Sequence, residues 1–201
     1  MTDKANIIKS MCDALSFGNE SAASNIARSE YPFTPPTPIT RTFTETQALR
    51  VFLRDGFIDR YSGSRLVFPP VLRVLSLALP EEFPYHRNWK MTETHKAYWE
   101  LFPTLDHVTP VAIGGRDDDD NLVSTSMLHN AAKAHWTLEE LGWSLHPPGD
   151  LTQWDGMLVW LLDFVERDRR ILSDKYVNSW CLVARSFCRG DQPVAPTIKQ
   201  Q

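Results

Sequence analysis

Several features that would place the chain in a special class are scarce or missing. Its three cysteines, Cys12, Cys181 and Cys188, are odd in number and form no C-x-x-C pair. This argues against a disulfide framework and against a thiolate zinc site. The sequence has no long apolar run free of charge, and its first residues lack the apolar core of a signal peptide. We therefore expect a cytoplasmic protein with no membrane partner.

A basic surplus is missing as well. The formal net charge is -4 and the pI about 5.8, whereas a tight DNA binder usually carries excess positive charge, because neutralised phosphates supply much of its affinity. A chain of this charge that binds nucleic acid must cluster its basic residues locally, or it binds weakly and needs help. The apolar share of 42% in 201 residues is that of an ordinary globular protein with a sizeable core.

Hydrophobic periodicity predicts helices near both ends of the chain. Residues 3–16 carry apolar side chains at helical spacing, and a shorter helix is expected at 22–28. The prolines within 31–40 exclude a helix there and indicate an extended connector. Two apolar stripes, over 154–165 and 172–187, predict C-terminal helices that pack against each other as a hairpin.

Start signals define further helices between these ends. The sequences TETQ at 44–47 and TLEE at 137–140 have the pattern of a capping box, and the first precedes a helix predicted over 45–55. A helix over 70–79 begins after a Pro-Pro pair and is apolar nearly all round, so we expect it to be buried.

The stretch Leu105–Trp136, LDHVTPVAIGGRDDDDNLVSTSMLHNAAKAHW, contains most of the residues that suggest chemistry. Apolar residues alternate around Val108, Val111 and Ile113 and are interrupted by Pro and Gly-Gly, a pattern that predicts a short β-hairpin. The alanine-rich part after Ser124 predicts a helix. The expected unit is therefore two strands followed by a helix.

This unit resembles the core of the HNH endonucleases, the ββα-metal nucleases. The matching positions, in order, are Asp106, His107, Pro110, Gly114, Gly115, Asp118, Asn121, Leu122, Asn130 and Lys133. The resemblance implies an α+β fold in which a ββα-metal (HNH) core, made of a short β-hairpin and a helix, is embedded in a mainly helical protein. It divides the chain into an N-terminal helical segment and Pro-rich linker (1–44), a nuclease domain (45–145) and a C-terminal helical hairpin and tail (146–201).

The resemblance also implies the role of each site residue. Asp106 and Asn130 would be the metal ligands, for one Mg²⁺ (or Mn²⁺) that prefers oxygen donors. His107 would be the general base, since an imidazole accepts a proton near neutral pH. Asn121 would fix the loop and so orient the base, and Lys133, one turn after Asn130, would contact the scissile phosphate. Apart from Asp118, the acidic run 117–120 is expected to be a solvated loop.

Many HNH proteins also carry two cysteine pairs that bind a structural zinc. The comparable positions here are Asp59, Ser62, Ser126 and His129, none of which is cysteine. Such a set lacks the soft thiolates that zinc prefers. The chain is therefore a variant without the zinc-binding knuckles, in which we expect no structural zinc and apolar packing of the core instead. For His129 itself we favour a surface or packing role over a ligand role.

The segment 81–104 has two interpretations. Basic residues and histidines alternate with aromatic rings: His86, Arg87, Lys90, His95 and Lys96 lie among Tyr85, Trp89, Tyr98 and Trp99. Such a segment can face nucleic acid, with cations on phosphates and rings stacked on bases. It can equally be a cap whose rings belong to the core, which we favour slightly. The roles of His86, His95 and His135 stay open.

The function expected from these residues is divalent-metal-dependent hydrolysis of phosphodiester bonds by an HNH endonuclease. The expected substrate and partner is DNA, with RNA as the other candidate. The alternative is a catalytically inactive HNH-like module that binds nucleic acid or protein. The full set of catalytic residues favours the enzyme, and the acidic balance of the chain favours the binding module.

Overall fold

The computed structural model describes residues 3–33, 35 and 42–189, and the chain divides into two units, Met1–Ile39 and Thr40–Gln201. The proline connector predicted within 31–40 lies largely outside the described residues. Within the described ranges, no helix combines the length and apolar character needed to cross a bilayer.

The first unit contains two helices, α1 (Lys4–Ser16) and α2 (Glu20–Glu30), and both were predicted. Each begins at a side-chain cap: Asp3 accepts a hydrogen bond from a backbone N–H of α1, and Asn19 does so for α2. Such caps satisfy N–H groups that have no partner inside the helix.

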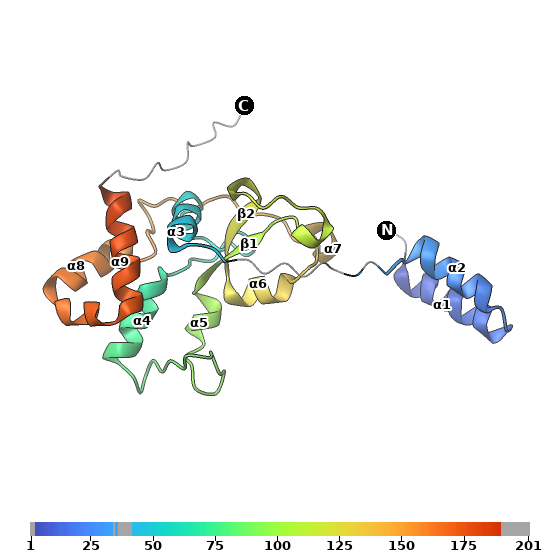
Figure 1. The fold of residues 1–201 in the computed structure, drawn as a ribbon, viewed down its shortest axis with the longest axis horizontal. Helices are drawn as coiled ribbons and strands as arrows, with labels where there is room; N and C mark the ends of the chain where they lie inside the picture. The colour runs from blue at the N-terminus through green and yellow to red at the C-terminus, as the bar shows by residue number, and fades with distance from the viewer. Residues whose placement is uncertain (1–2, 34, 36–41, 190–201) are drawn as a thin grey trace, which may run out of the picture. The chain divides into compact units, whose positions relative to one another are not determined.

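The second unit mixes helices with a small sheet, in agreement with the predicted α+β class (Figure 1). Its helices are α3 (Glu45–Arg54), α4 (Pro69–Ala78), α5 (Ala97–Glu100), α6 (Met127–Lys133), α7 (Leu138–Leu141), α8 (Leu158–Arg167) and α9 (Lys175–Cys188). The short 3₁₀ turns are η1 (Val111–Ile113), η2 (Asp119–Asn121) and η3 (Arg169–Ser173). Strands β1 (Pro103–His107) and β2 (Leu122–Ser126) form an antiparallel pair.

Local start signals predicted the helix ends well. The Thr44 hydroxyl accepts from the Gln47 N–H at 3.1 Å, and α3 ends just before a glycine with φ of 66°. At α7 both bonds of the capping box between Thr137 and Glu140 are present. The prediction that α4 is buried holds for most of the helix, six of whose ten residues are buried, although Leu77 is 41% exposed.

The second strand lies later in the sequence than predicted. Residues 122–126 form β2, all five of them buried, and α6 begins only at Met127, after the Ser126 hydroxyl has accepted from the His129 N–H. A strand covered on both faces shows no alternation of apolar and polar residues. The sequence LVSTS therefore gave no strand signal.

Residues 108–113, expected in the hairpin, are not strand. Val111–Ile113 form the 3₁₀ turn η1 inside the long loop that joins β1 to β2. Gly114 follows with φ of 96°, a left-handed conformation that glycine adopts without strain. Pro110 and this turn break the apolar alternation that had suggested a strand.

The main core joins elements from both ends of the second unit. Phe52 of α3 lies between Phe57 and Trp180 of α9, with ring centroids 6.0 and 6.4 Å apart, and Phe68 meets Trp180 edge-on at 5.4 Å. The C-terminal helices are part of this core. They are joined by η3 and linked to each other by an ion pair, while α9 also packs on α3 and α4, and α8 on α4.

Two buried carboxylates bind the outer edge of β2. The side chain of Asp55 accepts from the Ser124 N–H at 2.8 Å, and that of Asp59 accepts from the Ser126 N–H at 3.0 Å. Both aspartates are essentially inaccessible to solvent, with exposures of 0% and 1%. Backbone N–H groups that would otherwise lie unpaired at the edge of a two-stranded sheet are thereby satisfied.

The contacts of Asp59 show that the prediction of apolar packing in place of the zinc knuckle is wrong. Its carboxylate lies 2.7 Å from His129 Nδ1 and accepts from the Thr125 hydroxyl at 3.1 Å, besides the Ser126 N–H. Three of the four knuckle positions, Asp59, Ser126 and His129, are thus joined by polar bonds. His129 has a structural role here, as favoured from the sequence.

We predict that Asp59→Asn lowers the free energy of unfolding by roughly 2–4 kcal/mol, because an amide offers one acceptor oxygen and turns a donor towards buried N–H groups. The matched control is Asp150→Asn, since Asp150 is exposed and, among the described residues, its carboxylate accepts hydrogen bonds from Thr152 alone. Urea unfolding of both variants measures the effect. Equal midpoints for the two variants would contradict the role given to Asp59.

A second prediction concerns acid. Burial opposes ionisation of Asp59, but hydrogen bonds from the Ser126 N–H, His129 and the Tyr61 N–H outweigh it and hold the pKa of this carboxyl below its ordinary value. The unfolded carboxyl titrates near pH ~3.9. Its contribution is therefore present above that pH and lost as pH falls through the lower folded pKa.

The stability gap between wild type and Asp59→Asn should accordingly narrow below about pH 4. Urea midpoints of both proteins at neutral pH and across the acid range measure this gap. A gap that stays constant down to the acid-unfolded state would show that the charge of Asp59 is not what stabilises the fold.

Candidate functional site

Asp106 lies near the end of β1 and is held by two donors. Its Oδ2 accepts from the Tyr61 hydroxyl at 2.6 Å and lies 2.9 Å from Lys133 Nζ of α6. Burial, followed by the charge of Asp106, raises the pKa of Tyr61 far above its usual value. The phenol therefore stays protonated and continues to donate to the carboxylate.

Lys133 does not occupy the position predicted for a phosphate contact. Its side chain is fully buried, and besides pairing with Asp106 its ammonium donates to the His107 carbonyl at 2.7 Å. It also lies 5.8 Å from the centre of the Tyr61 ring. The prediction of a direct contact with substrate is wrong for this arrangement, and Lys133 is instead a positioning residue for Asp106 and the end of β1.

The ring of His107 is held by a carboxylate that the sequence did not single out. Nε2 lies 2.9 Å from Asp117 Oδ1, and the ring packs against Phe43 with centroids 5.9 Å apart. The imidazole is 13% exposed and Asp117 is 53% exposed, so the pair lies at the surface. Asp117 was predicted to belong to a solvated acidic loop, and nothing in a run of four aspartates indicated which one would turn towards His107.

Asn121 closes the loop that follows His107. Its amide accepts from the Thr109 N–H and donates to the Thr109 carbonyl, both at 2.9 Å, and donates to the Arg116 carbonyl at 2.7 Å. A side chain at Gly115 would place Cβ 1.9 Å from the Thr109 carbonyl oxygen, which explains the glycine. These bonds tie the loop to itself and not to the helix, and the part of Asn121 in orienting a catalytic base stays a prediction. Asp118 accepts from the Asn121 N–H and pairs with Arg116.

Asn130 is fixed by its amide nitrogen. Nδ2 donates to the Thr104 hydroxyl at 2.9 Å and to the Leu105 carbonyl at 3.2 Å, so the side chain joins α6 to β1 next to Asp106. Within the described ranges no hydrogen bond is found to its amide oxygen. That oxygen is the atom of Asn130 suited to a metal ligand.

Asp106 and His107 lie on opposite faces of β1. Both belong to the regular strand, with Asp106 opposite Val123 and His107 opposite Leu122, and neighbouring strand residues point to opposite sides. A substrate that contacts both must lie across the end of the strand.

The residues fit a weakly held divalent ion better than a resident one. The second oxygen of Asp106 and the amide oxygen of Asn130 are hard donors of the kind Mg²⁺ prefers. No group of three or more His, Cys, Asp or Glu suited to a metal occurs among the residues that the structure describes. The ammonium of Lys133 also offsets the charge of Asp106. Oxygens of substrate and water would have to complete the coordination.

The buried pair of Asp106 and Lys133 gives a prediction on stability. Asp106→Asn and Lys133→Met should each destabilise by about 3–5 kcal/mol, because each leaves one partner buried without its counter-charge. The double variant should lose clearly less than the sum, since both charges are gone together. Urea unfolding of the four proteins measures the coupling. Strictly additive losses would mean that the two side chains do not act as a pair.

Function has to be inferred from this geometry. The side chains concerned come from β1, the loop after it and α6, and they combine an acid, a histidine and two amides around one strand end. No protein-family model matches the chain, and no curated protein or solved structure matches it.

Proposed function

We propose that the chain is a divalent-metal-dependent endonuclease of the HNH type that hydrolyses phosphodiester bonds in DNA. One observation carries the proposal. The order β1, loop, β2 and α6 ties Asn130 to β1 next to Asp106 and puts His107 on the opposite face of the same strand end, while Asn121 closes the loop that follows. These are the residues that the family resemblance assigns to the metal, the base and the loop.

His107 would act as the general base. If Asp117 accepts a hydrogen bond from Nε2–H, the lone pair lies on Nδ1, and that nitrogen takes the proton from the attacking water. The carboxylate then stabilises the imidazolium that forms, as an acidic partner of a catalytic histidine does in general. Asp117 would therefore be a positioning residue for His107.

Asp106 and Asn130 would hold the metal ion. When bound, a divalent ion supplies charge stabilisation for the transition state and for the departing oxygen. Tyr61 and Lys133 both bind Oδ2 of Asp106, so they fix the direction of Oδ1. Positioning of this kind reduces the reorganisation needed when substrate arrives.

The acidic loop is less of an obstacle to DNA than its composition suggests. Asp117 pairs with His107, Asp118 with Arg116 and Asp119 with Arg50. Each pair reduces the repulsion that a bare carboxylate would exert on an approaching phosphate. The inactive binding module remains the rival function, and the engagement of Asp106 by Lys133 is the observation that favours it.

We predict that His107→Ala slows cleavage of supercoiled plasmid by roughly 10²- to 10⁴-fold, the usual contribution of a general base. The matched control is His135→Ala, an exposed histidine just beyond α6, which should cut as wild type does. Cleavage is measured with Mg²⁺ or Mn²⁺, with and without chelator, and unfolding midpoints verify the fold. Wild-type rates for His107→Ala would remove this residue from the mechanism.

The same assay separates the enzyme from the binding module. In the enzyme, the folded double variant Asp106→Asn/Lys133→Met no longer cuts, whereas its affinity for the plasmid holds, because backbone contacts to phosphates do not need that carboxylate. A wild-type protein that binds DNA but cuts it with neither ion, and a double variant that behaves identically, would establish the module.

A further inference from the structure

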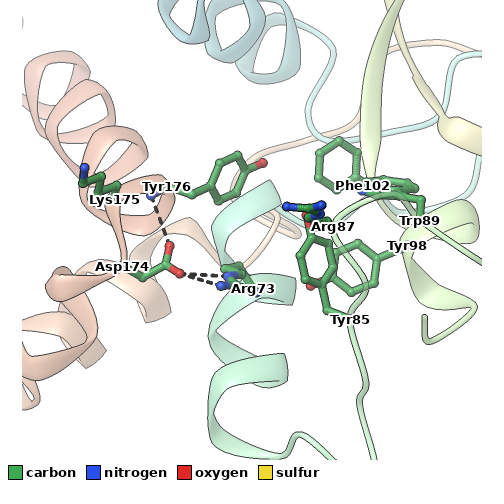
Figure 2. A pocket seen from close by; sticks show the side chains of 9 residues that line it. All are labelled: Arg73, Tyr85, Arg87, Trp89, Tyr98, Phe102, Asp174, Lys175 and Tyr176. Carbon is green, nitrogen blue, oxygen red and sulfur yellow. Dashed lines mark hydrogen bonds and ion pairs between the residues drawn. The ribbon is translucent and has the colours of Figure 1, made fainter. Parts of the chain in front are cut away.

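The second unit contains a pocket of about 400 Å³, and none of the residues around Asp106 lines it. Its lining comes from α4, the segment 81–96, α5 and the start of α9 (Figure 2). The volume lies in the range of small-molecule sites. The lining combines aromatic rings with cations, and both come largely from the aromatic and basic segment noted in the sequence.

Four aromatic residues form one wall of the pocket. Trp89 meets Phe102 edge-on with centroids 4.9 Å apart, and Tyr85 lies 5.0 Å from Tyr98. Tyr98 is fully buried and hydrogen-bonded to Ser76, and burial raises its pKa to about 12. Tyr85 and Trp89 are only half-buried, so they present ring surface to the pocket.

The backbone at Trp89 is strained. Its φ of 50° is in the left-handed region, which residues other than glycine adopt only at a cost in free energy. The Trp89 N–H donates to the His86 carbonyl at 2.8 Å. This turn and the packing of the ring against Phe102 hold the conformation. Strain of this kind gathers at ligand sites because it places a side chain that relaxed backbone would not.

The pocket also carries positive charge that is not neutralised. The guanidinium of Arg73 forms an ion pair with Asp174 at 2.8 Å and lies 4.9 Å from the centre of the Tyr85 ring. Arg87 and Lys175 are exposed, and no ion pair is found for either of them within residues 3–33, 35 and 42–189. Arg87 lies among the aromatic rings, whereas Lys175 lies at the far end of the pocket, beyond Asp174 (Figure 2). In a chain of net charge -4, an exposed arginine beside an aromatic wall is a local positive charge to which a phosphate is attracted.

We propose that this pocket binds a nucleotide, with the base against the exposed rings of Tyr85 and Trp89 and the phosphate held by Arg87. Stacking on aromatic rings accepts any base, and the guanidinium selects for the phosphate. An uncharged aromatic compound would leave Arg87 unused, and a free phosphate would leave the rings uncovered. The site goes beyond the proposed cleavage of DNA and holds whether or not the chain cuts.

The ligand chemistry, a base joined to a phosphate, has two sources. One is a free nucleotide, and the other is one unit of a single strand whose base has left its stack. Calorimetric titration with adenosine 5′-monophosphate, and with a short single strand of thymidylates, examines both. A chelator in every buffer excludes binding through a metal at Asp106.

We expect adenosine 5′-monophosphate or the oligonucleotide to bind the wild-type protein. Adenosine and inorganic phosphate should each bind at least about tenfold more weakly than the monophosphate, since each retains only one half of the contacts. If the oligonucleotide binds about tenfold more tightly than the monophosphate, the occupant is a strand. Comparable affinities identify a free nucleotide.

The decisive variant is Arg87→Ala, in which the affinity should fall at least about tenfold. The matched control, Arg169→Ala, removes the same charge from an exposed position outside the pocket and should bind within about twofold of wild type. Wild-type affinity in the first variant, or no binding of either probe to wild type, would overturn the proposal. His107→Ala should bind unchanged, so failure of this site and failure of the nuclease are told apart.

Discussion

The arrangement around the candidate site depends on the outer edge of β2. A sheet of two strands is marginal by itself, and here the free N–H groups of β2 are bound by the buried carboxylates of Asp55 and Asp59. Arg54 and Arg60 neutralise Asp55 at 2.9 Å each. The segment fixed in this way leads directly to Tyr61, whose hydroxyl binds Asp106. A polar contact at one edge of the sheet thus determines the position of an acid at the other strand.

The pair of Asp106 and Lys133 has opposite consequences for structure and for chemistry. It neutralises a buried ammonium and orients the carboxylate, which suits a site that is assembled before substrate arrives. It also reduces the attraction of the site for a cation. In the proposed nuclease, the two effects are compatible only if the ion and the phosphate bind together, so that the negative charge of the substrate offsets the positive charge of Lys133.

What could be predicted from the sequence was local. Helix caps such as Thr44 with Gln47 act within one turn and can be read from the local sequence. The order of the acid, the histidine and the asparagines was enough to indicate that Asn121 fixes the loop after His107. What could not be predicted was set by residues far away in the chain. Strand β2 is buried because residues near Asp59, which lie far away in the sequence, pack against it. The burial of Lys133 and the pairing of Asp117 with His107 likewise depend on how the folded chain packs.

The main core joins helices from both ends of the second unit, and this has a consequence for folding during synthesis. Residues of α3 and α9 that touch are far apart in the chain: the Ser179 hydroxyl donates to Glu45 across 134 positions. A chain emerging from the ribosome therefore presents Phe52 and Phe68 well before Trp180 exists to cover them, and domains complete their folding as units. An unfinished chain carries every residue of the candidate site without the packing that holds them together. The candidate site is therefore completed only after synthesis has reached α9.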